Sequence, residues 1–403
     1  MQAALTNSVK FLIFWVFLIV GLAVGSKIDV PTITLAWLGG LWLVIFLSDQ
    51  EDRRIELVSI ALFAGTAGAL IWQLTGGEVW LRLSGLSFIS ERLISLRDLL
   101  IDRIFLSLPE PHGSLLAGIL FGNRLKLDRE LLETFRIVGL SHLIAVSGFN
   151  LTILTANAQT FFRGIIGRNS LWLGLVIIFF FIIITGAPAS ILRAGVMASV
   201  VIIAQIIGRP SQSLNLLILA SGVLAVFEPK IIFDVGFQLS VVATYGLISL
   251  APLIGQALRG VPAPKSLKGI LAETLSATIL TAPLIILHFE RLALVSPLTN
   301  MLVLPIIPLL MALGLTSAAV LLISPAIGGL LVMLTWPLLS WVLLVGDWFS
   351  QLAWSATEAS LNHFLIAAIM ALIVLAVEFL GRFVKPGELD YLDELFLSTE
   401  PKP

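Results

Sequence analysis

The stretch GLSHLIAVSGFNLTIL, residues 139–154, combines the apolar character of a membrane span with several polar side chains. Apolar residues fill most of its positions, yet His142, Ser147 and Asn150 lie within about three helical turns of one another. The whole chain shares this apolar character: 58% of its 403 residues are hydrophobic and only 12% are charged. Soluble domains carry roughly a quarter charged residues. The composition therefore predicts an all-α polytopic membrane protein.

Apolar runs long enough to cross about 30 Å of hydrocarbon recur along the chain and predict about 11–12 transmembrane helices. They fall near residues 11–25, 29–48, 55–74, 140–162, 171–188, 190–207, 213–228, 232–254, 270–288, 297–322, 326–350 and 362–384. Several contain helix breakers, namely Gly186 with Pro188, Pro283, and Pro297, Pro305 and Pro308. Membrane helices tolerate breaks where the freed backbone groups face protein or a water-filled cavity. The breaks therefore predict a polar interior path.

The distribution of Lys and Arg predicts that both termini are cytoplasmic. If the N-terminus lies inside, the short outside loops hold only Lys27, Lys230 and Arg291, and the other short-loop cations lie inside. The long segment 75–139 is left out of this comparison because long loops cross largely regardless of charge. The chain shows no cleavable signal pattern.

Four parts follow along the sequence: N-terminal transmembrane helices (1–75), an extracytoplasmic polar segment (76–139), the main transmembrane domain (140–385) and an acidic cytoplasmic tail (386–403). In the polar segment, apolar residues from Ile89 to Ile104 repeat at helical spacing and predict an amphipathic helix. It would lie on the membrane surface or cap the bundle; a packing helix of a small subdomain is the alternative. Asp128 is a candidate N-cap of a following short helix.

Polar residues inside the spans mark a candidate site. An arginine at mid-membrane costs about 2.5–3.5 kcal/mol, so Arg193 is expected to face a partner, a cavity or a ligand, unless it snorkels to an interface. Asp234 and Gln238 are expected one turn apart on the same helix face, and Asp234 is the natural partner for an arginine. Asn300 lies beside a proline-broken stretch and is expected to bond its loosened backbone.

Residue spacing argues against several activities. His142 and Ser147 are five residues apart, which on a helix is a poor spacing for a catalytic base and its nucleophile. Ser147 and Gly148 also suit ordinary helix packing. An intramembrane serine hydrolase is therefore a weak alternative. The four histidines are scattered and cysteine is absent, so neither a metal site nor a cofactor is expected. No GxxxxGK[ST] loop is present, and no enzymatic activity is predicted.

Five phrases in order resemble the membrane domain of the ComEC-type competence proteins. They are LLAGILFGNR (115–124), FRIVGLSHLIAVSGFNLTIL (135–154), GAPASILRAGVMA (186–198), FDVGFQLSVVATYGL (233–247) and SPLTNMLVLPIIP (296–308). The resemblance implies a channel in the bacterial inner membrane that passes single-stranded DNA into the cytoplasm during transformation. It also implies partners: a DNA receptor, a separate nuclease, and a cytoplasmic helicase or single-strand-binding proteins. The residues expected to line or brace the path are His142, Ser147, Gly148, Asn150, Arg193, Asp234, Gln238 and Asn300.

We expect this chain to differ from typical members of that family in two respects. The segment between the third span and the motif is too short for the full OB-like domain that such relatives carry, and no C-terminal metallo-β-lactamase-like domain follows the last span. Broken helices also build transporter sites, so a carrier for a small polar solute remains an alternative function. A scaffold in an envelope complex is another.

Overall fold

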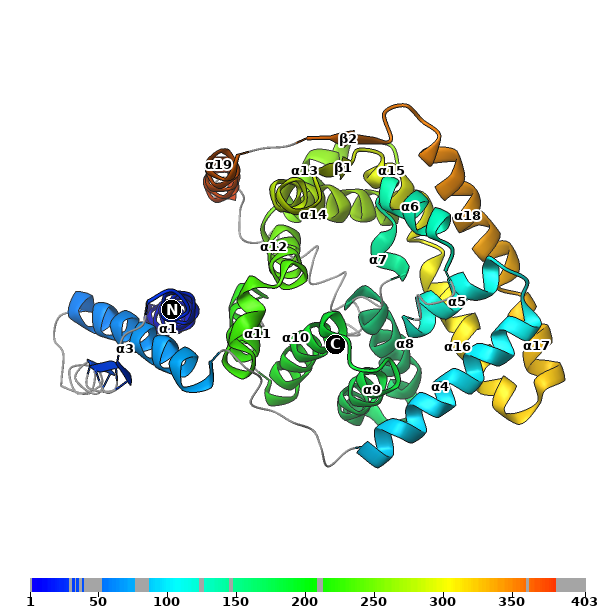
Figure 1. Cartoon of the computed structure of the whole chain (residues 1–403), viewed down its shortest axis with the longest axis horizontal. Coiled ribbons are helices and arrows are strands. Elements are labelled where there is room, and N and C mark those ends of the chain that lie inside the picture. Colours follow the sequence, from blue (N-terminus) through cyan, green and yellow to red (C-terminus); the bar gives the residue numbers. More distant parts are fainter. Residues whose placement is uncertain are drawn as a thin grey trace. The chain divides into compact units, whose positions relative to one another are not determined.

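A computed structural model describes residues 2–28, 31–32, 34–35, 38–39, 53–76, 87–122, 127–144, 148–208, 213–359 and 362–381 (Figure 1). These residues are nearly all helical, with a single short strand pair, β1 (Arg291–Ala293) antiparallel to β2 (Ala356–Glu358). The chain divides into two compact units, Met1–Leu86 with Val196–Val241, and Ser87–Gly195 with Val242–Pro403. The predicted all-α class is confirmed.

The helices have the following bounds. The first unit contains α1 (Gln2–Gly25), α3 (Arg53–Thr75), α11 (Ser213–Phe227) and η3 (Pro229–Phe233). Helices α10 (Ala189–Ile207) and α12 (Val235–Ser249) contribute to both units. The second unit contains α4 (Ser87–Ser107), α5 (His112–Phe121), α6 (Arg129–Ile137), α7 (Ser141–Ile144), α8 (Gly148–Ile166), η2 (Gly167–Asn169), α9 (Ser170–Ile184), α13 (Ala251–Ala257), η4 (Leu258–Gly260), α14 (Lys265–Phe289), α15 (Ser296–Val303), α16 (Ile307–Ile323), α17 (Pro325–Met333), α18 (Trp336–Ser350) and α19 (His363–Gly381).

Four helical segments within the described ranges are long and apolar enough to cross a membrane, or six if two bent pairs each count as one span. The four are Leu57–Thr75, Ser190–Ile207, Lys265–Phe289 and Pro325–Ser350. The bent pairs are α12 with Ala251–Gly260, at 43°, and α15 with α16, at 49°. The chain is therefore a multi-pass membrane protein. The total of 11–12 spans stays a prediction, and the 386–403 tail lies outside the described residues.

The structure confirms two of the predicted helix breaks and corrects the third. Helices α9 and α10 are separated at Gly186, which has a φ of 81°, and α15 and α16 are separated before Ile307. The expected break at Pro283 is wrong, because α14 continues through it to Phe289. A membrane helix can accommodate one proline by local adjustment of its hydrogen bonds.

The core of the second unit is built around α5, in which every residue from Gly113 to Phe121 is buried. Figure 1 shows α5 close to α4, α16 and α18, and all three helices contact it. Gly314 of α16 faces the side chains of Leu116 and Leu120, so its missing side chain allows the two helices to approach. This short apolar helix is therefore enclosed by protein.

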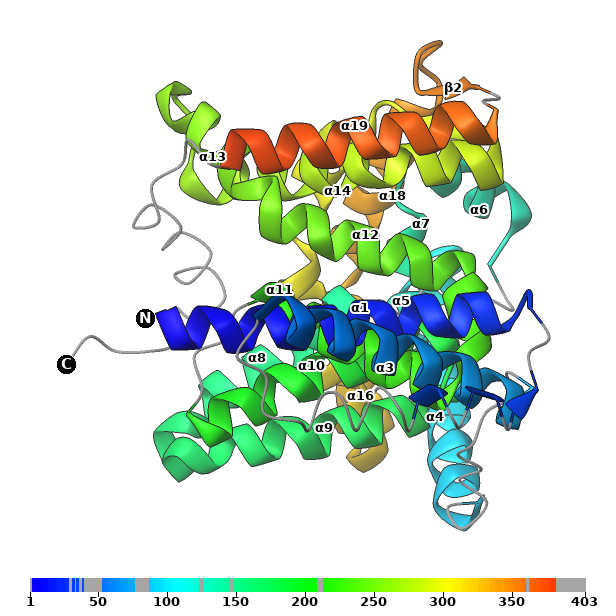
Figure 2. The ribbon, with the colours of Figure 1, turned by 90° about the vertical axis from the view of Figure 1, so that its left-hand side faces the viewer.

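Helix α4 is the predicted amphipathic helix, and it packs into this core. Leu100, Ile101 and Ile104 are buried, whereas Asp98 and Asp102 are exposed. The helix contacts α5, α9, α16 and α17, and Figure 2 shows it running across the direction of α8 and α9. This arrangement matches the bundle-capping alternative. Asp128 is also confirmed as an N-cap, because its carboxylate accepts a bond from Glu130 N.

The first unit is organised by close contact between α1 and α3, which lie side by side and run in the same direction (Figure 2). A Cβ atom on Gly21 would lie 2.0 Å from Gly65 O, and one on Gly68 would lie 2.1 Å from Leu18 O. These distances leave no room for a side chain. Small residues therefore set the spacing of this pair, as in many membrane helix contacts.

The glycine contact predicts a position-specific effect on stability. We expect Gly68→Ala to lower stability by about 1–3 kcal/mol, because the new methyl group meets the α1 backbone, which cannot move aside cheaply. Gly65→Ala is the matched control, since its Cβ would lie 3.7 Å from the nearest atom, Phe17 O. Unfolding of both purified variants in detergent measures the difference. Equal loss of stability in the two variants would contradict the close contact between Gly68 and the α1 backbone.

Candidate functional site

Asn150 joins the start of α8 to the end of α5. Its side chain is 0% exposed, and Nδ2 donates a hydrogen bond to Ile119 O at 3.0 Å. Ile119 lies in the last turn of α5, where carbonyl groups have no partner within the helix. Asn150 thus satisfies one of these carbonyls. Its Oδ1 atom is buried and has no hydrogen-bond partner among the described residues, so the amide keeps a spare acceptor.

The turn before α7 packs directly on α15. Gly139 has a φ of 78°, and a Cβ there would lie 2.6 Å from the Ser296 side chain. Thr299 donates its hydroxyl to Val138 O at 2.8 Å. His142 is exposed, and its Nδ1 lies 3.1 Å from Gly139 O. Two phrases that are about 160 residues apart in sequence therefore form one contact.

Asn300 is buried in α15, but its hydrogen bond differs from the expected one. Its Nδ2 donates to Ser296 Oγ at 3.2 Å, and Oδ1 is buried without a partner in the described part of the chain. The carbonyl freed at the nearby break, Leu302 O, instead accepts a bond from Trp341 Nε1 at 3.1 Å. Asn300 therefore keeps a free acceptor, as Asn150 does.

Arg193 lies in the first turns of α10, within the span Ser190–Ile207, and is only 6% exposed. This burial argues against the alternative in which the side chain snorkels to an exposed surface. Gly148, at the start of α8, would place a Cβ 3.3 Å from Ala194 Cβ, next to Arg193 in the chain. Gly195 packs on Ile182 of α9. Small residues thus bring α8, α9 and the guanidinium-bearing turn of α10 close together.

The interpretation of Asp234 and Gln238 as neighbours on one helix face is wrong. Asp234 precedes α12 and caps it, because Oδ1 accepts a hydrogen bond from Phe237 N at 2.7 Å. Gln238 turns back and donates Nε2 to Ile232 O at 3.0 Å. Short polar side chains favour such caps over helical positions. Pairing of Asp234 with Arg193 stays a prediction, and Ser147 lies outside the described residues.

Sequence reasoning missed two arginines of α4 that bind the ends of other helices. Arg97 Nη1 lies 3.5 Å from Ile184 O, the end of α9, and Arg103 Nη1 donates to Leu321 O near the end of α16. Cations at helix C-termini satisfy free carbonyls and the negative end of the helix dipole. The sequence did show these two arginines on a predicted amphipathic helix. It did not show which carbonyl groups they would bind.

Further contacts fasten the rim of this unit. Arg291 of β1 bonds Glu133 of α6 at 2.6 Å and Glu358 of β2 at 3.0 Å. Hydrogen bonds to Glu358 and Glu133 raise the pKa of Arg291, so it remains charged at any physiological pH. His112 Nε2 lies 2.8 Å from Ser340 Oγ, and its ring stacks on Trp336, which ties α5 to α18.

The amide, hydroxyl and guanidinium groups described above can form hydrogen bonds with a polar ligand. Within the described ranges, no three His, Asp or Glu side chains come together as metal ligands. A carboxyl group that the sequence analysis did not single out, Glu273, lies partly buried within the span Lys265–Phe289. An ionisable residue inside a span is a signal of function, and it was available in the sequence.

Comparison with known proteins identifies the family. The model of the family described as Competence protein matches residues 119–383. ComE operon protein 3 of Bacillus subtilis (strain 168) is 26% identical over 279 residues, covering 68% of this chain and 34% of the relative. The chain thus spans about a third of that relative's length, and no solved structure matches it. Since the family match covers more than half of the chain and includes Asn150, Arg193 and Asn300, this protein belongs to the competence protein family.

Proposed function

We propose that this chain forms the membrane-embedded part of a conduit that passes single-stranded DNA into the cytoplasm of a bacterium. Membership of the competence family supports a role in DNA uptake during transformation. The observation that carries the step from uptake to a conduit is the buried guanidinium of Arg193 within a membrane span. The conduit would lie in the inner membrane, with both termini in the cytoplasm.

Arg193 suits a phosphate chain for electrostatic reasons. A cation inside a span is costly to insert, so it is retained where a partner or a ligand offsets that cost. Guanidinium groups bind phosphate through short charge-assisted hydrogen bonds. A conduit must also release what it binds, so a few cations serve transit better than a continuous basic groove. The proposed role of Arg193 is to attract successive phosphates of the passing strand.

The remaining polar groups divide into those that brace and those that contact the strand. Asp234 and Gln238 bond the backbone around η3 and brace it. The spare Oδ1 acceptors of Asn150 and Asn300 suit N–H donors of nucleobases. His142 lies in α7, Gly148 begins α8, and Ser147 comes directly before Gly148 in the sequence. In this proposal they complete the path.

The proposal requires partners outside this chain. The sequence contains no phosphate-binding GxxxxGK[ST] loop, and the proposal assigns the driving force to a source outside this chain. A DNA receptor, a nuclease that removes the complementary strand, and a cytoplasmic helicase or single-strand-binding protein are the partners expected from the resemblance to competence proteins. The match to the Bacillus subtilis relative covers only 34% of that protein. We therefore assign these activities to the whole uptake assembly and not to this chain.

The first test compares Arg193→Ala with wild type in liposomes that take up labelled single-stranded DNA. We expect uptake to fall by about tenfold or more, because a hydrogen bond to a charged group contributes roughly 1.5–3 kcal/mol. Arg193→Lys should keep part of the activity, since it keeps the charge. Arg163→Ala, at the far and exposed end of α8, is the matched control and should behave like wild type.

Uptake at the wild-type level by a folded Arg193→Ala protein would remove Arg193 from the path. If wild type is inactive in liposomes, the same variants are compared by transformation frequency in cells, where the partners are present. Normal transformation with Arg193→Ala, at normal membrane levels of the protein, would then refute the proposal.

The second test asks whether the phosphate charge is recognised. We expect wild type to transport a phosphodiester oligonucleotide but not a methylphosphonate oligonucleotide of the same sequence, because only the first carries the charge that Arg193 would attract. A labelled mononucleotide is supplied in parallel. Equal transport of both oligonucleotides would contradict phosphate recognition, and transport of the mononucleotide alone would indicate a small-solute carrier.

A further inference from the structure

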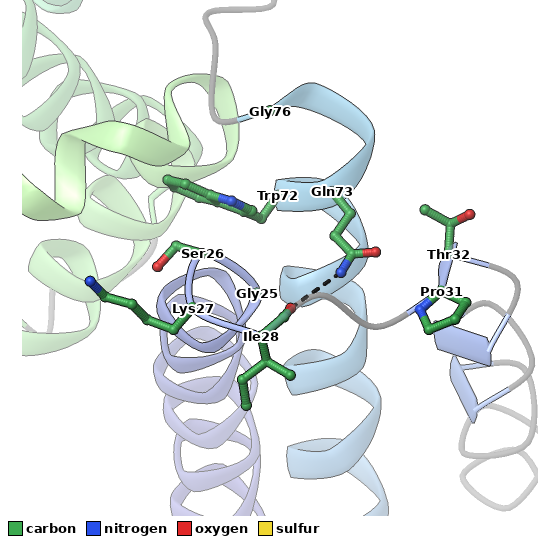
Figure 3. A pocket seen from close by; sticks show the side chains of 9 residues that line it. All are labelled: Gly25, Ser26, Lys27, Ile28, Pro31, Thr32, Trp72, Gln73 and Gly76. Atoms are coloured by element: carbon green, nitrogen blue, oxygen red, sulfur yellow. Dashed lines mark hydrogen bonds between the residues drawn. The ribbon is translucent and has the colours of Figure 1, made fainter.

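A pocket of about 440 Å³ lies in the first unit, at the common end of α1 and α3 (Figure 3). Three segments line it: the end of α1 with Ser26, Lys27 and Ile28; the end of α3 with Trp72 and Gln73; and the short stretch at Pro31 and Thr32. Gln73 Nε2 donates to Ile28 O at 3.3 Å and joins the first two segments. The pocket is thus built by backbone and side chains from separate parts of the unit.

The charges around the pocket have both signs. Because α1 and α3 are parallel, both helices end here, and each C-terminus carries a partial negative charge. Lys27 is exposed at the rim and supplies an ammonium group. Trp72 extends over Ser26 in Figure 3 and is held edge-on by Phe233, at 5.9 Å between ring centroids. A zwitterionic ligand would find complementary groups for both of its charges.

The pocket lies at one end of a helix that is long and apolar enough to cross a membrane. The span Leu57–Thr75 ends where Trp72 and Gln73 line it. Tryptophan and lysine are enriched at membrane surfaces, because each places an apolar body in the hydrocarbon and a polar end in the headgroup layer. A ligand in this pocket would therefore lie in the headgroup layer of a membrane that this helix crosses.

An apolar stripe leads up to the pocket along α1. Val20, Val24 and Ile28 follow at four-residue spacing and are 47%, 44% and 52% exposed. Ile28 N donates to Val24 O, so the helical spacing continues past the end of α1. Ile28 belongs both to the stripe and to the pocket lining. The combined surface, apolar along the helix and polar at its end, has the polarity pattern of a phospholipid.

We propose that this surface binds a phospholipid with an ethanolamine headgroup. The phosphate lies beside Lys27, and the ammonium group faces the carbonyl ends of α1 and α3 and the face of Trp72. One acyl chain follows Val20, Val24 and Ile28. A soluble phosphodiester would leave this stripe uncovered, which is why a lipid is preferred. The lipid site does not depend on the proposed conduit.

Native mass spectrometry of the full chain tests this proposal. The purified protein is mixed with equal amounts of phosphatidylethanolamine and phosphatidylglycerol. We expect wild type to retain the ethanolamine lipid preferentially, and Lys27→Ala to bind it about fivefold more weakly, as expected for the loss of one basic residue near a membrane surface. Val24→Asn should also weaken retention, because it interrupts the apolar stripe without filling the pocket. Lys10→Ala, in the first half of α1 and away from the pocket lining, is the matched control.

Three outcomes would overturn the assignment. Equal retention by wild type, Lys27→Ala and Val24→Asn would show that the pocket holds no lipid. Stronger retention of phosphatidylglycerol would contradict the role given to the helix ends. Displacement of the lipid by glycerophosphoethanolamine or by a short single-stranded oligonucleotide, at the concentration of the lipid itself, would assign the pocket to a soluble phosphodiester.

Discussion

Carbonyl groups at broken or ended helices must find donors, because a bilayer offers no water to bind them. In the second unit, side chains from distant helices meet this need. Asn150 bonds Ile119 O, Trp341 bonds Leu302 O, and Arg97 and Arg103 of α4 reach the ends of α9 and α16. An unsatisfied buried carbonyl costs about 1–3 kcal/mol, so these contacts fix which helix ends lie together. The packing of the unit follows from where its helices stop.

This constraint explains what the sequence could and could not predict. Composition and apolar runs were sufficient for the all-α membrane class, and Gly186 and Pro305 correctly marked breaks. Pro283 did not end α14, because one missing donor is tolerated within a packed helix. The polar residue types at the site were also predictable. Their partners were not, since a donor such as Asn150 bonds a carbonyl 31 residues earlier that only folding brings near.

Polar groups in the described part of this protein differ in how fully the fold uses their hydrogen-bonding atoms, and residue type alone does not predict this difference. Gln238 uses its amide donor on the Ile232 carbonyl, as a structural brace does. Asn150 and Asn300 use their donors similarly but retain a buried acceptor in the described structure. Arg97 and Arg103 bond the ends of other helices, and Arg193 is 6% exposed within a span. A buried side chain with one hydrogen-bonding atom that the fold does not use can still bind a ligand through that atom. By this criterion Asn150 and Asn300 are better candidates for ligand contact than Gln238.

The placement of the aromatic side chains constrains how the proposed conduit would hold DNA. Proteins that bind single strands tightly combine cations with aromatic platforms on which bases stack. Here Trp336, Trp341 and Trp348 of α18 are exposed on the unit's surface, where they suit contact with lipid. The buried polar groups assigned to the proposed path are the Arg193 guanidinium and the Oδ1 atoms of Asn150 and Asn300, which would contact phosphates and base edges. Contacts of this kind are few and independent of stacking, so a strand held by them would be released at each step, as transport requires.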